Sequence, residues 1–494
     1  MNFSIIVAAQ KTASQGRARQ MSLPLQLGER RFEMAQQRFF AELSGDHNPM
    51  HLDPVAARRT QAGAPVAHGM HTALWAIDAF YAARACPAPN RLTARFDRFI
   101  YLDEAVVAEL RLESAERVEM DLSVEGGRVA TIRLEFGEGK PSAPHPCESV
   151  DSPATCPADL SMEDLAAAAG CFAYARPAAA AAAAFPHASE TIGAGRINGL
   201  IALSTLVGMH CPGLHSIFSR FEVDLHDGPA DEHAELAFRV RRTQPLLRMA
   251  TIDVVGAGIS GAVNAFLRHP PVRQPKIAQL VGAIEPGAFA GARVLVVGGS
   301  RGLGELIVKL SALGGADVVA TYASGCADAE AVVEEVRDYG ARCEAFSLDA
   351  GAAIASQLTG AGAFTHVYYL ASPPIFRKRS SSFSPDVLAE FLQIYATAFF
   401  ELCTILARQG DPVRIFYPSS VAVEDPPKGA IEYAMAKAAA ELLCVEVVRR
   451  FPALDIVLER LPRLLTDQTA TVLPVESPNA VEILLPIIGR MHAP

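Results

Sequence analysis

The chain has 494 residues, of which half are hydrophobic and a fifth are charged, and its formal net charge is −10. This profile is typical of a globular protein with about three domains, at roughly 100–200 residues per domain. Nucleic-acid binding is not expected, because it requires clustered Lys and Arg to neutralise phosphates. Nine scattered cysteines without a Cys-x-x-Cys pair indicate reduced thiols in a cytoplasmic protein, and neither a disulfide framework nor a zinc site.

Two loop-like stretches divide the chain. One at 139–157 is rich in Pro, Ser and Cys, and one at 269–275 carries three prolines; both compositions are typical of linkers. The short apolar stretch near the N-terminus is not followed by a cleavage site, so it is not expected to be a secretion signal. Residues 1–22 are instead expected to form an extension. No stretch approaches the about 18 apolar residues of a membrane-spanning helix, so no membrane partner is expected. The predicted domains are 23–140, 156–270 and 288–494.

The first two domains look like a diverged internal repeat. In each, a glycine, Gly69 or Gly199, opens a stretch that is apolar on most sides, as expected for a helix buried against a sheet. Alternating strand-like segments follow, at 106–112, 119–124 and 129–136 in the first domain and at 234–240 and 249–255 in the second. One long helix wrapped by an antiparallel sheet is the hot-dog arrangement. Two copies predict an α+β double hot-dog.

The third domain alternates strand, glycine-rich turn and helix. Its expected strands lie at 293–297, 317–321, 366–370 and 413–417, and its expected helices at 303–313 and 328–339. This rhythm predicts an α/β Rossmann-type, doubly wound parallel sheet.

The string S-G-D-H-N-P-M-H-L-D at 44–53 is the strongest motif of the first domain. It resembles the motif S-G-D-x-N-P-x-H-x-D of the MaoC-like, R-specific enoyl-thioester hydratases, and the resemblance covers roughly residues 23–139. Hydration of an enoyl thioester needs a base that activates water and an acid that protonates the alpha carbon. The resemblance assigns these roles to Asp46 and His51, with Asn48 helping to hold the water.

A second part of the resemblance concerns the start of the central helix. The negative charge that develops on the thioester oxygen needs a hydrogen-bond donor, and a main-chain N–H at a helix start is suited to this. Gly69 can supply this N–H, and His68-Gly69 matches the family's usual His-Gly pair. Taken alone, the string at 44–53 would be interpreted as an ordinary polar turn. Its combination with the His-Gly pair favours a catalytic site. The second domain lacks the motif and has Asn198 in place of His68, so we predict a non-catalytic half. The resemblance implies that such a half helps to shape the acyl tunnel.

The third domain carries a G-x-x-x-G-x-G turn after its first strand. Glycines allow a tight turn and the close approach of a pyrophosphate, which the N-terminus of the next helix attracts. This spacing resembles the short-chain dehydrogenase/reductase family. The predicted cofactor contacts of the turn are Gly298, Ser300, Arg301, Gly302, Leu303 and Gly304.

A Tyr-x-x-x-Lys motif at Tyr433 and Lys437, with Ser420 upstream, strengthens this resemblance. By the family's chemistry, Tyr433 donates a proton to the substrate carbonyl and Ser420 orients that carbonyl. Lys437, one helical turn on, lowers the tyrosine pKa and holds the cofactor ribose. The motif alone arises often by chance, but its order after the glycine turn favours the family. No metal site is predicted.

The preferred cofactor is predicted from the second strand. NAD enzymes usually place an acid at its end, whereas 320–324 contains none and Arg301 lies inside the phosphate turn. Both features resemble NADPH-dependent ketoacyl reductases, in which Asp349 would contact the adenine edge. The family's Asn-Asn-Ala-Gly is replaced at 369–372, and its relay asparagine by Tyr395 or a neighbour. The catalytic efficiency of the reductase, the shape of the substrate that it accepts and its assembly into homo-oligomers are therefore left open.

Together these motifs predict a bifunctional enzyme. It would reduce a 3-oxoacyl thioester with NADPH to the (R)-3-hydroxyacyl thioester and dehydrate this to the trans-2-enoyl thioester, on CoA or acyl carrier protein. Two alternatives stay open. One is a hydratase with a dehydrogenase that runs oxidatively in acyl breakdown, and the other is a partly degenerate acyl-thioester-binding scaffold with one live site.

Overall fold

The chain forms two compact units. The computed structural model describes residues 24–137, 155–174, 178–226, 234–375, 383–469 and 475–493. One unit contains the described parts of 1–52 and 65–268, and the other those of 53–64 and 269–494. The predicted extension 1–22 and most of the predicted linker 139–157 lie outside the described residues. The short segment 53–64, which the sequence places in the first domain, packs within the second unit.

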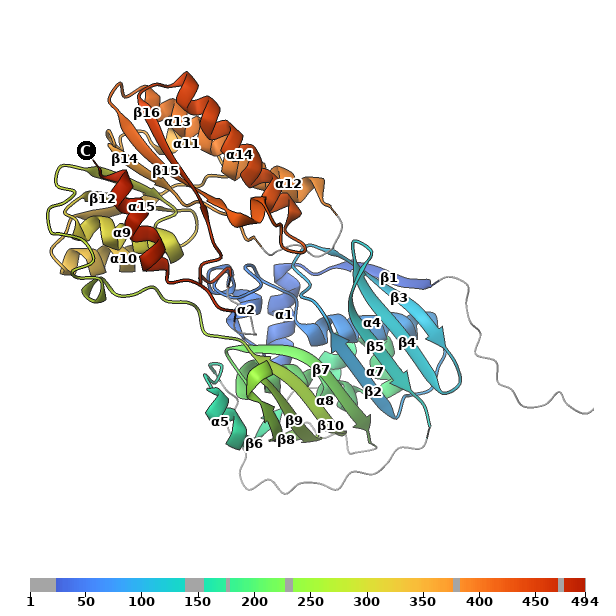
Figure 1. Ribbon diagram of the computed structural model, residues 1–494. Coiled ribbons are helices and arrows are strands. Elements are labelled where there is room, and N and C mark those ends of the chain that lie inside the picture. The colour runs from blue at the N-terminus through green and yellow to red at the C-terminus, as the bar shows by residue number, and fades with distance from the viewer. Residues whose placement is uncertain are drawn as a thin grey trace, which may run out of the picture. The chain divides into compact units, whose positions relative to one another are not determined.

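The first unit is built on a ten-stranded antiparallel sheet (Figure 1). In spatial order its strands are β1 (Leu25–Arg31), β3 (Ala105–Glu113), β4 (Arg117–Val124), β5 (Gly127–Glu135), β2 (Arg91–Phe96), β7 (Ser216–Leu225), β10 (Ile259–Leu267), β9 (Met249–Gly256), β8 (Ala234–Gln244) and β6 (Ala169–Tyr174). Strands β2 and β7 pair at the centre. Outward from this pair, both halves follow the same strand order, which matches an internal repeat.

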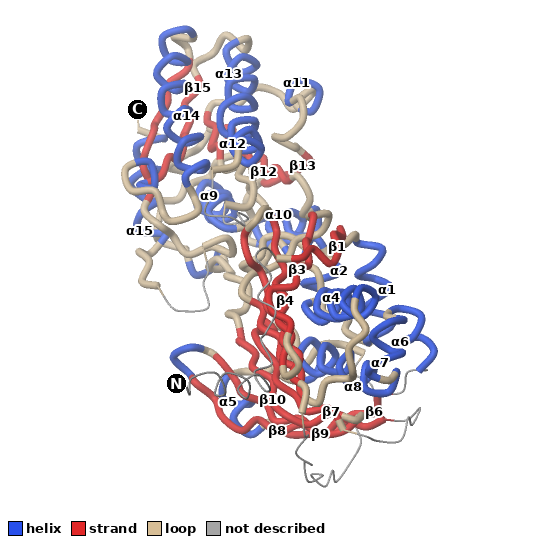
Figure 2. The backbone as a smooth tube through the Cα atoms, turned by 90° about the vertical axis from the view of Figure 1, so that its right-hand side faces the viewer, coloured by secondary structure: helices blue, strands red, loops and turns tan. Residues whose placement is uncertain are grey.

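Each half of the sheet carries one long helix. These are α4 (Gly69–Ala83) and α8 (Ala194–Thr205), which continues as the π-helical turn η1 (Leu206–His210). Both lie within the curve of the sheet (Figure 2). Side chains of β4 alternate between buried and partly exposed, because successive residues of a strand point to opposite faces. The expected start of the second helix at Gly199 was wrong, since α8 begins five residues earlier.

Shorter helices complete the first unit. They are α1 (Met34–Ser44), α2 (Pro49–Leu52), α5 (Met162–Ala167), α6 (Ala178–Ala184), α7 (Pro186–Ile192) and the 3-10 turn η2 (Pro245–Leu247).

The second unit is a six-stranded parallel sheet. In spatial order its strands are β13 (Cys343–Ser347), β12 (Asp317–Tyr322), β11 (Arg293–Val297), β14 (His366–Tyr369), β15 (Val413–Ser420) and β16 (Leu454–Leu461). With β11 as the first strand, this is the order 3-2-1-4-5-6 of the Rossmann fold. The predicted doubly wound sheet is therefore confirmed.

Helices cover both faces of this sheet. One apolar core lies under α9 (Gly302–Leu313), α10 (Cys326–Asp338) and α15 (Ala480–Met491). The other lies under α12 (Pro385–Leu392), η4 (Gln393–Ala398), α13 (Phe399–Ala407) and α14 (Ile431–Arg450). Short helices α3 (Pro54–Ala57) and α11 (Ile354–Gln357), with the 3-10 turns η3 (Ile277–Gln279) and η5 (Val421–Val423), complete the unit.

One sequence expectation about membranes needs correction. The continuous helical stretch Pro385–Ala407 is long and apolar enough to cross a membrane, and the bent pair formed by α7 and α8 with η1 passes the same test together. Within 385–407, Phe391, Tyr395 and Phe399 are buried in the core of the parallel sheet. A third of the apolar window in this stretch is buried inside the protein.

Candidate active sites

The loop between α1 and α2 sets the geometry of the first motif. Gly45 ends α1 in the left-handed conformation, with φ 79°, which side-chain-bearing residues rarely adopt. Pro49 begins α2, and proline suits the first position of a helix. Because the loop turns the chain back within a few residues, Asp46 before α2 and His51 within it are held close together.

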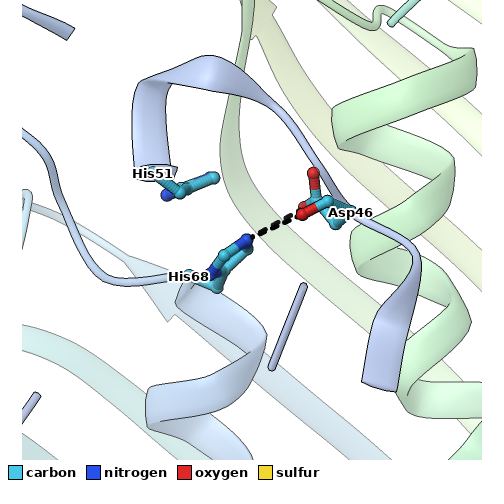
Figure 3. Close-up of side chains that lie close together, drawn as sticks. All are labelled: Asp46, His51 and His68. Atoms are coloured by element: carbon cyan, nitrogen blue, oxygen red, sulfur yellow. Dashed lines mark hydrogen bonds and ion pairs between the residues drawn. The ribbon is translucent and has the colours of Figure 1, made fainter. Parts of the chain in front are cut away.

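Asp46, His51 and His68 converge on one point (Figure 3). Each offers a carboxylate oxygen or ring nitrogen, and these three atoms lie within 4.8 Å of one another. The rings of His51 and His68 stack with centroids 3.9 Å apart. His68 Nε2 lies 3.1 Å from the main-chain oxygen of Asp46 and 3.9 Å from its carboxylate. The spacing of the three would also allow them to ligate a metal ion. His68, noted in the sequence only as part of the His-Gly pair, is a third member of this site.

Hydrogen bonds indicate where the histidines carry their protons. His51 Nδ1 lies 2.8 Å from the main-chain oxygen of Val66, which can only accept. Gln37 Oε1 accepts the main-chain N–H of His68 and lies 2.9 Å from His68 Nδ1. We infer that Nδ1 carries the proton in a neutral His51 ring. His51 is then left with an unprotonated Nε2 that can accept a proton, whereas both ring nitrogens of His68 face an oxygen acceptor.

Burial determines which protonation states are favoured. Asp46 is 3% exposed and His68 is fully buried. Burial raises the pKa of Asp46, and the nearby His51 and a hydrogen bond from Ser204 oppose this. Burial holds the pKa of His68 well below its usual range. Burial therefore disfavours the charged forms of both Asp46 and His68.

The second half of the ten-stranded sheet contributes to this site. Ser204 on α8 donates its hydroxyl to Asp46 Oδ2 at 2.7 Å. A Cβ on Gly208, in η1, would overlap the Asp46 carboxylate, so glycine is needed there. The Asn48 amide donates to the main-chain oxygens of Gly208 and Gly213 at 3.0 and 3.1 Å. Asn48 thus links the loop that carries the motif to the second half of the sheet. Its amide N–H groups are directed at these two oxygens, and the predicted contact of Asn48 with the reacting water stays a prediction.

Gly69 is the first residue of α4, as the sequence predicts. The N–H groups of a helix's first turn have no acceptor within the helix, and the positive end of the helix dipole suits a developing negative charge. A Cβ at this position would lie 3.2 Å from the ring of Phe96. A glycine at position 69 therefore leaves room for the Phe96 ring and puts no side chain beside an N–H that has no acceptor within the helix.

We expect Ser204→Ala to shift the limb of the hydration pH profile that Asp46 sets toward higher pH. The hydrogen bond from Ser204 lowers the pKa of Asp46. Its removal raises that pKa, so the carboxyl of the variant stays protonated up to a higher pH. We also expect hydration at neutral pH to slow by about tenfold, the effect of one hydrogen bond to a charged group. Ser189→Ala, which removes another buried hydroxyl of the same unit, is the control. An unshifted pH profile in folded Ser204→Ala would show that Ser204 does not tune the carboxyl.

In the second unit, the glycine turn joins β11 to α9 as predicted. Gly298 and Gly302 have φ of 84° and 58°, a region that favours glycine. A Cβ on Gly304 would overlap the main-chain oxygen of Gly298. Ser300, Arg301 and Leu303 lie between these glycines. The turn leaves the first N–H groups of α9 without helical acceptors, so it fits the pyrophosphate of a dinucleotide.

Ser420, Tyr433 and Lys437 come together as predicted. Ser420 ends β15, and the other two lie one turn apart on α14. Burial raises the pKa of Tyr433, and a hydrogen bond from Ser420 opposes this. Lys437 is 6% exposed and donates to the main-chain oxygen of Pro418 at 2.7 Å. Burial lowers the pKa of Lys437 to about 7.

Tyr395 is the residue that, with its neighbours, the resemblance suggests in place of the family's relay asparagine. It belongs to the π-helical turn η4, and its ring centre is 4.0 Å from Lys437 Nζ. Its hydroxyl is 2.6 Å from Ser372 Oγ. The ring also packs edge-on against Tyr433, with centroids 5.8 Å apart. A cation–π contact therefore stabilises the charged form of Lys437.

The remaining predicted cofactor residues lie at the same edge of the parallel sheet. Asp349 follows β13, is exposed, and accepts the N–H of Gly351 at 2.8 Å. Arg301 immediately precedes α9, and its Nη1 lies 3.6 Å from the Asp467 carboxylate. The end of β12 carries Tyr322 and no acid. These positions fit a dinucleotide that runs from α9 across the end of β12.

Several solved structures are similar to parts of the chain. A short-chain dehydrogenase/reductase from Serratia marcescens BCRC 10948 is 28% identical over 35% of this chain and 74% of that one, with a TM-score of 0.32. A short-chain dehydrogenase from Burkholderia cenocepacia J2315 in complex with NADP is 24% identical over 42% and 92%, with a TM-score of 0.37. A 3-oxoacyl (acyl-carrier-protein) reductase from Agrobacterium tumefaciens C58 with NADP bound is 21% identical over 36% and 73%, with a TM-score of 0.33.

Two family models match the sequence. The model of the MaoC like domain matches residues 9–132, and that of the short chain dehydrogenase matches residues 292–452. No curated protein matches the chain. The first match includes the converging Asp46, His51 and His68, and the second includes the glycine turn and Tyr433.

Proposed function

Because the chain carries a MaoC-like domain followed by a short-chain dehydrogenase domain, we propose that it is a bifunctional acyl-thioester enzyme. In this proposal a 3-oxoacyl thioester, carried by CoA or acyl carrier protein, is reduced with NADPH to the (R)-3-hydroxyacyl thioester. The MaoC-like site then removes water to give the trans-2-enoyl thioester, or adds water in the reverse direction. The described free cysteines support a location in the reducing cytoplasm.

The observation that carries the proposal is the convergence of Asp46, His51 and His68. Elimination of water needs a base for the proton on C2 and an acid for the leaving hydroxyl. The unprotonated imidazole Nε2 of His51 takes the C2 proton, and protonated Asp46 gives its proton to the hydroxyl. Water leaves as the C2–C3 double bond forms. The N–H of Gly69 stabilises the charge on the thioester oxygen in between.

We interpret the ten-stranded sheet with α4 and α8 as a double hot-dog. The equal strand order of the two halves and their one long helix each support this interpretation. The second half lacks the acid–base motif, and it supplies Ser204 and Gly208 to the site of the first half. One catalytic site for each pair of hot-dogs follows from this division of roles.

An apolar cavity of about 220 Å³ in the same unit supports an acyl substrate. It is lined by Arg30, Ala35, Gln36, Phe39, His71, Ala184 and Phe185. His71 Nδ1 lies 3.3 Å from the amide nitrogen of Gln37, whose oxygen also contacts His68. One residue of the cavity wall, His71, is thus linked through Gln37 to His68 of the acid–base site, and the carbon-rich lining of the cavity suits an acyl chain.

The reductase half of the proposal rests on the Ser-Tyr-Lys set. When bound, NADPH supplies the hydride that adds to the C3 carbonyl carbon. Tyr433 donates the proton to the carbonyl oxygen, which Ser420 orients. Lys437, when charged, lowers the tyrosine pKa and contacts the ribose. The missing acid at the end of β12 supports NADPH over NADH.

Separate assays of the two half-reactions test this proposal. We expect the full chain to hydrate a crotonyl thioester and to reduce a short 3-oxoacyl thioester with NADPH. Because a charged 2′-phosphate contact contributes about tenfold or more, kcat/KM with NADPH is expected to exceed that with NADH by at least this factor. A preference for NADH would favour the oxidative alternative. Tight NADPH binding without any turnover would favour the scaffold alternative.

A further inference from the structure

The segment 53–64 presents two arginines to the second compact unit, to which it belongs by its packing. Its first part is the short helix α3, capped by Asp53, whose Oδ1 accepts the N–H groups of Val55 and Ala56 at 2.8 and 3.2 Å. Arg58 and Arg59 follow directly at the end of α3. The cap and the helix therefore fix the direction in which these side chains leave the segment.

Both arginines reach the end of the second strand of the parallel sheet. Arg58 Nη1 donates to Ser324 Oγ at 3.1 Å, two residues beyond β12. Arg58 and Arg59 both pair with the carboxylate of Asp328, in the first turn of α10. A Cβ on Gly325 would overlap the Arg58 guanidinium. The glycine before α10 thus makes room for an arginine from a distant part of the sequence.

A third guanidinium joins this cluster. Arg301, in the glycine turn, donates from Nη1 to the main-chain oxygen of Arg58 at 2.9 Å, and its other ionic partner is Asp467. Three arginines face two aspartates, which leaves one positive charge unbalanced. Burial and the nearby Arg58 lower the pKa of Arg301 to about 10. One further anionic group would therefore balance the charge of the cluster.

Arg58 also has an unused donor. Its Nε is buried and has no hydrogen-bond partner among the described residues. A buried donor without an acceptor is costly, and a guanidinium presents its N–H groups in a rigid fork that matches a phosphate. The N-terminus of α10 beside it adds the positive end of a helix dipole. All of these features suit a phosphate group at the end of β12.

We propose that Arg58, assisted by Arg59, binds the 2′-phosphate of NADPH. The inference rests on the proposed function, because it requires the second unit to bind a dinucleotide. In this fold the ribose that carries the 2′-position lies at the end of the second strand, where NAD enzymes place an acid and NADP enzymes accommodate the phosphate with an arginine. Here the arginine comes from outside the range 292–452 that the short chain dehydrogenase model matches. Cofactor choice would thus depend on a segment that follows the hydratase motif in sequence.

Ligand binding to the full chain tests this inference without measuring turnover. The probes are NADPH, NADH, adenosine 2′,5′-bisphosphate and 5′-AMP, titrated by calorimetry. In the unmodified chain we expect each 2′-phosphorylated ligand to bind more tightly than its partner without that phosphate. Arg58→Ala is expected to weaken binding of NADPH and of the bisphosphate by about ten- to hundredfold, as for one charged hydrogen-bonded contact. Binding of NADH and 5′-AMP is expected to stay unchanged.

Two further variants make the result specific. Arg490→Ala removes an exposed arginine of the same unit that pairs with Glu459, and it is expected to change no affinity. Arg58→Lys keeps the positive charge but loses the forked guanidinium geometry, so it is expected to cause an intermediate loss of NADPH affinity. It also serves as a second test if Arg58→Ala does not fold. If the unmodified chain prefers NADPH and Arg58→Ala keeps that preference, this inference is overturned while the proposed function stands. If the unmodified chain binds NADH as tightly as NADPH, the inference and the proposed cofactor are both overturned.

Discussion

Asp46→Asn is expected to slow hydration of a crotonyl thioester by on the order of a hundredfold or more, since a general acid or base contributes about a hundred- to ten-thousandfold. In hydration, the reverse of the proposed elimination, the Asp46 carboxylate takes the proton of the attacking water, and the amide cannot do this. It keeps the size of the carboxyl, and its oxygen can still accept the hydroxyl of Ser204, so the fold is expected to survive. The loss of the enoyl-thioester absorbance measures hydration. NADPH-dependent reduction, measured in the same preparation, is expected to stay intact.

The matched variants are His51→Ala and His47→Ala. His51→Ala removes the Nε2 that carries the C2 proton in either direction and is expected to cause a comparable loss. His47 occupies the variable position of the motif and is not one of the three converging residues, so His47→Ala is expected to retain hydration. Unchanged hydration in a folded Asp46→Asn variant would refute the assignment of this site.

Tyr433→Phe is expected to stop ketone reduction while NADPH affinity stays nearly normal. The ring keeps its edge-on packing against Phe391 and Tyr395 and loses only the hydroxyl. Loss of the proton donor is expected to cost about a hundred- to ten-thousandfold in rate. Oxidation of NADPH with a 3-oxoacyl thioester measures turnover, and a fluorescence titration of NADPH measures binding.

Lys437→Ala provides the contrast to Tyr433→Phe. It is expected to damage both turnover and NADPH binding, because it removes a ribose contact and raises the tyrosine pKa. It also leaves the main-chain oxygen of Pro418 without the lysine hydrogen bond. Full reductase activity in Tyr433→Phe would contradict the mechanism.

Features that depend on short stretches of sequence could be predicted. The β-branched run 293–297 between turn residues gave a strand with the observed bounds of β11. Asp46 and His51 were expected to act together, and they do lie together because both are held by one short loop. The order of Ser420, Tyr433 and Lys437 likewise predicted their meeting, since β15 leads through a short connection into α14.

Features that depend on the pairing of distant segments could not be predicted. Ser204 is 158 residues from Asp46 in sequence, and it lies on an apolar helix where no pattern marks it. It reaches Asp46 because β2 pairs with β7 and brings the two halves of the sheet together. Gln37, which orients His68, is a buried polar residue of α1 with no motif around it. Arg58 was missed for the same reason, because its partner Asp328 is 270 residues away.

The most direct test of the central claim is a single reaction of the full chain with NADPH and 3-oxobutanoyl-CoA, with the acyl products separated by chiral chromatography. The account predicts that NADPH is consumed and that (R)-3-hydroxybutanoyl-CoA and crotonyl-CoA both accumulate. With Asp46→Asn, the reaction is expected to stop at the (R)-3-hydroxy thioester. Formation of the (S)-isomer, or equal crotonyl-CoA from the Asp46→Asn variant, would contradict it.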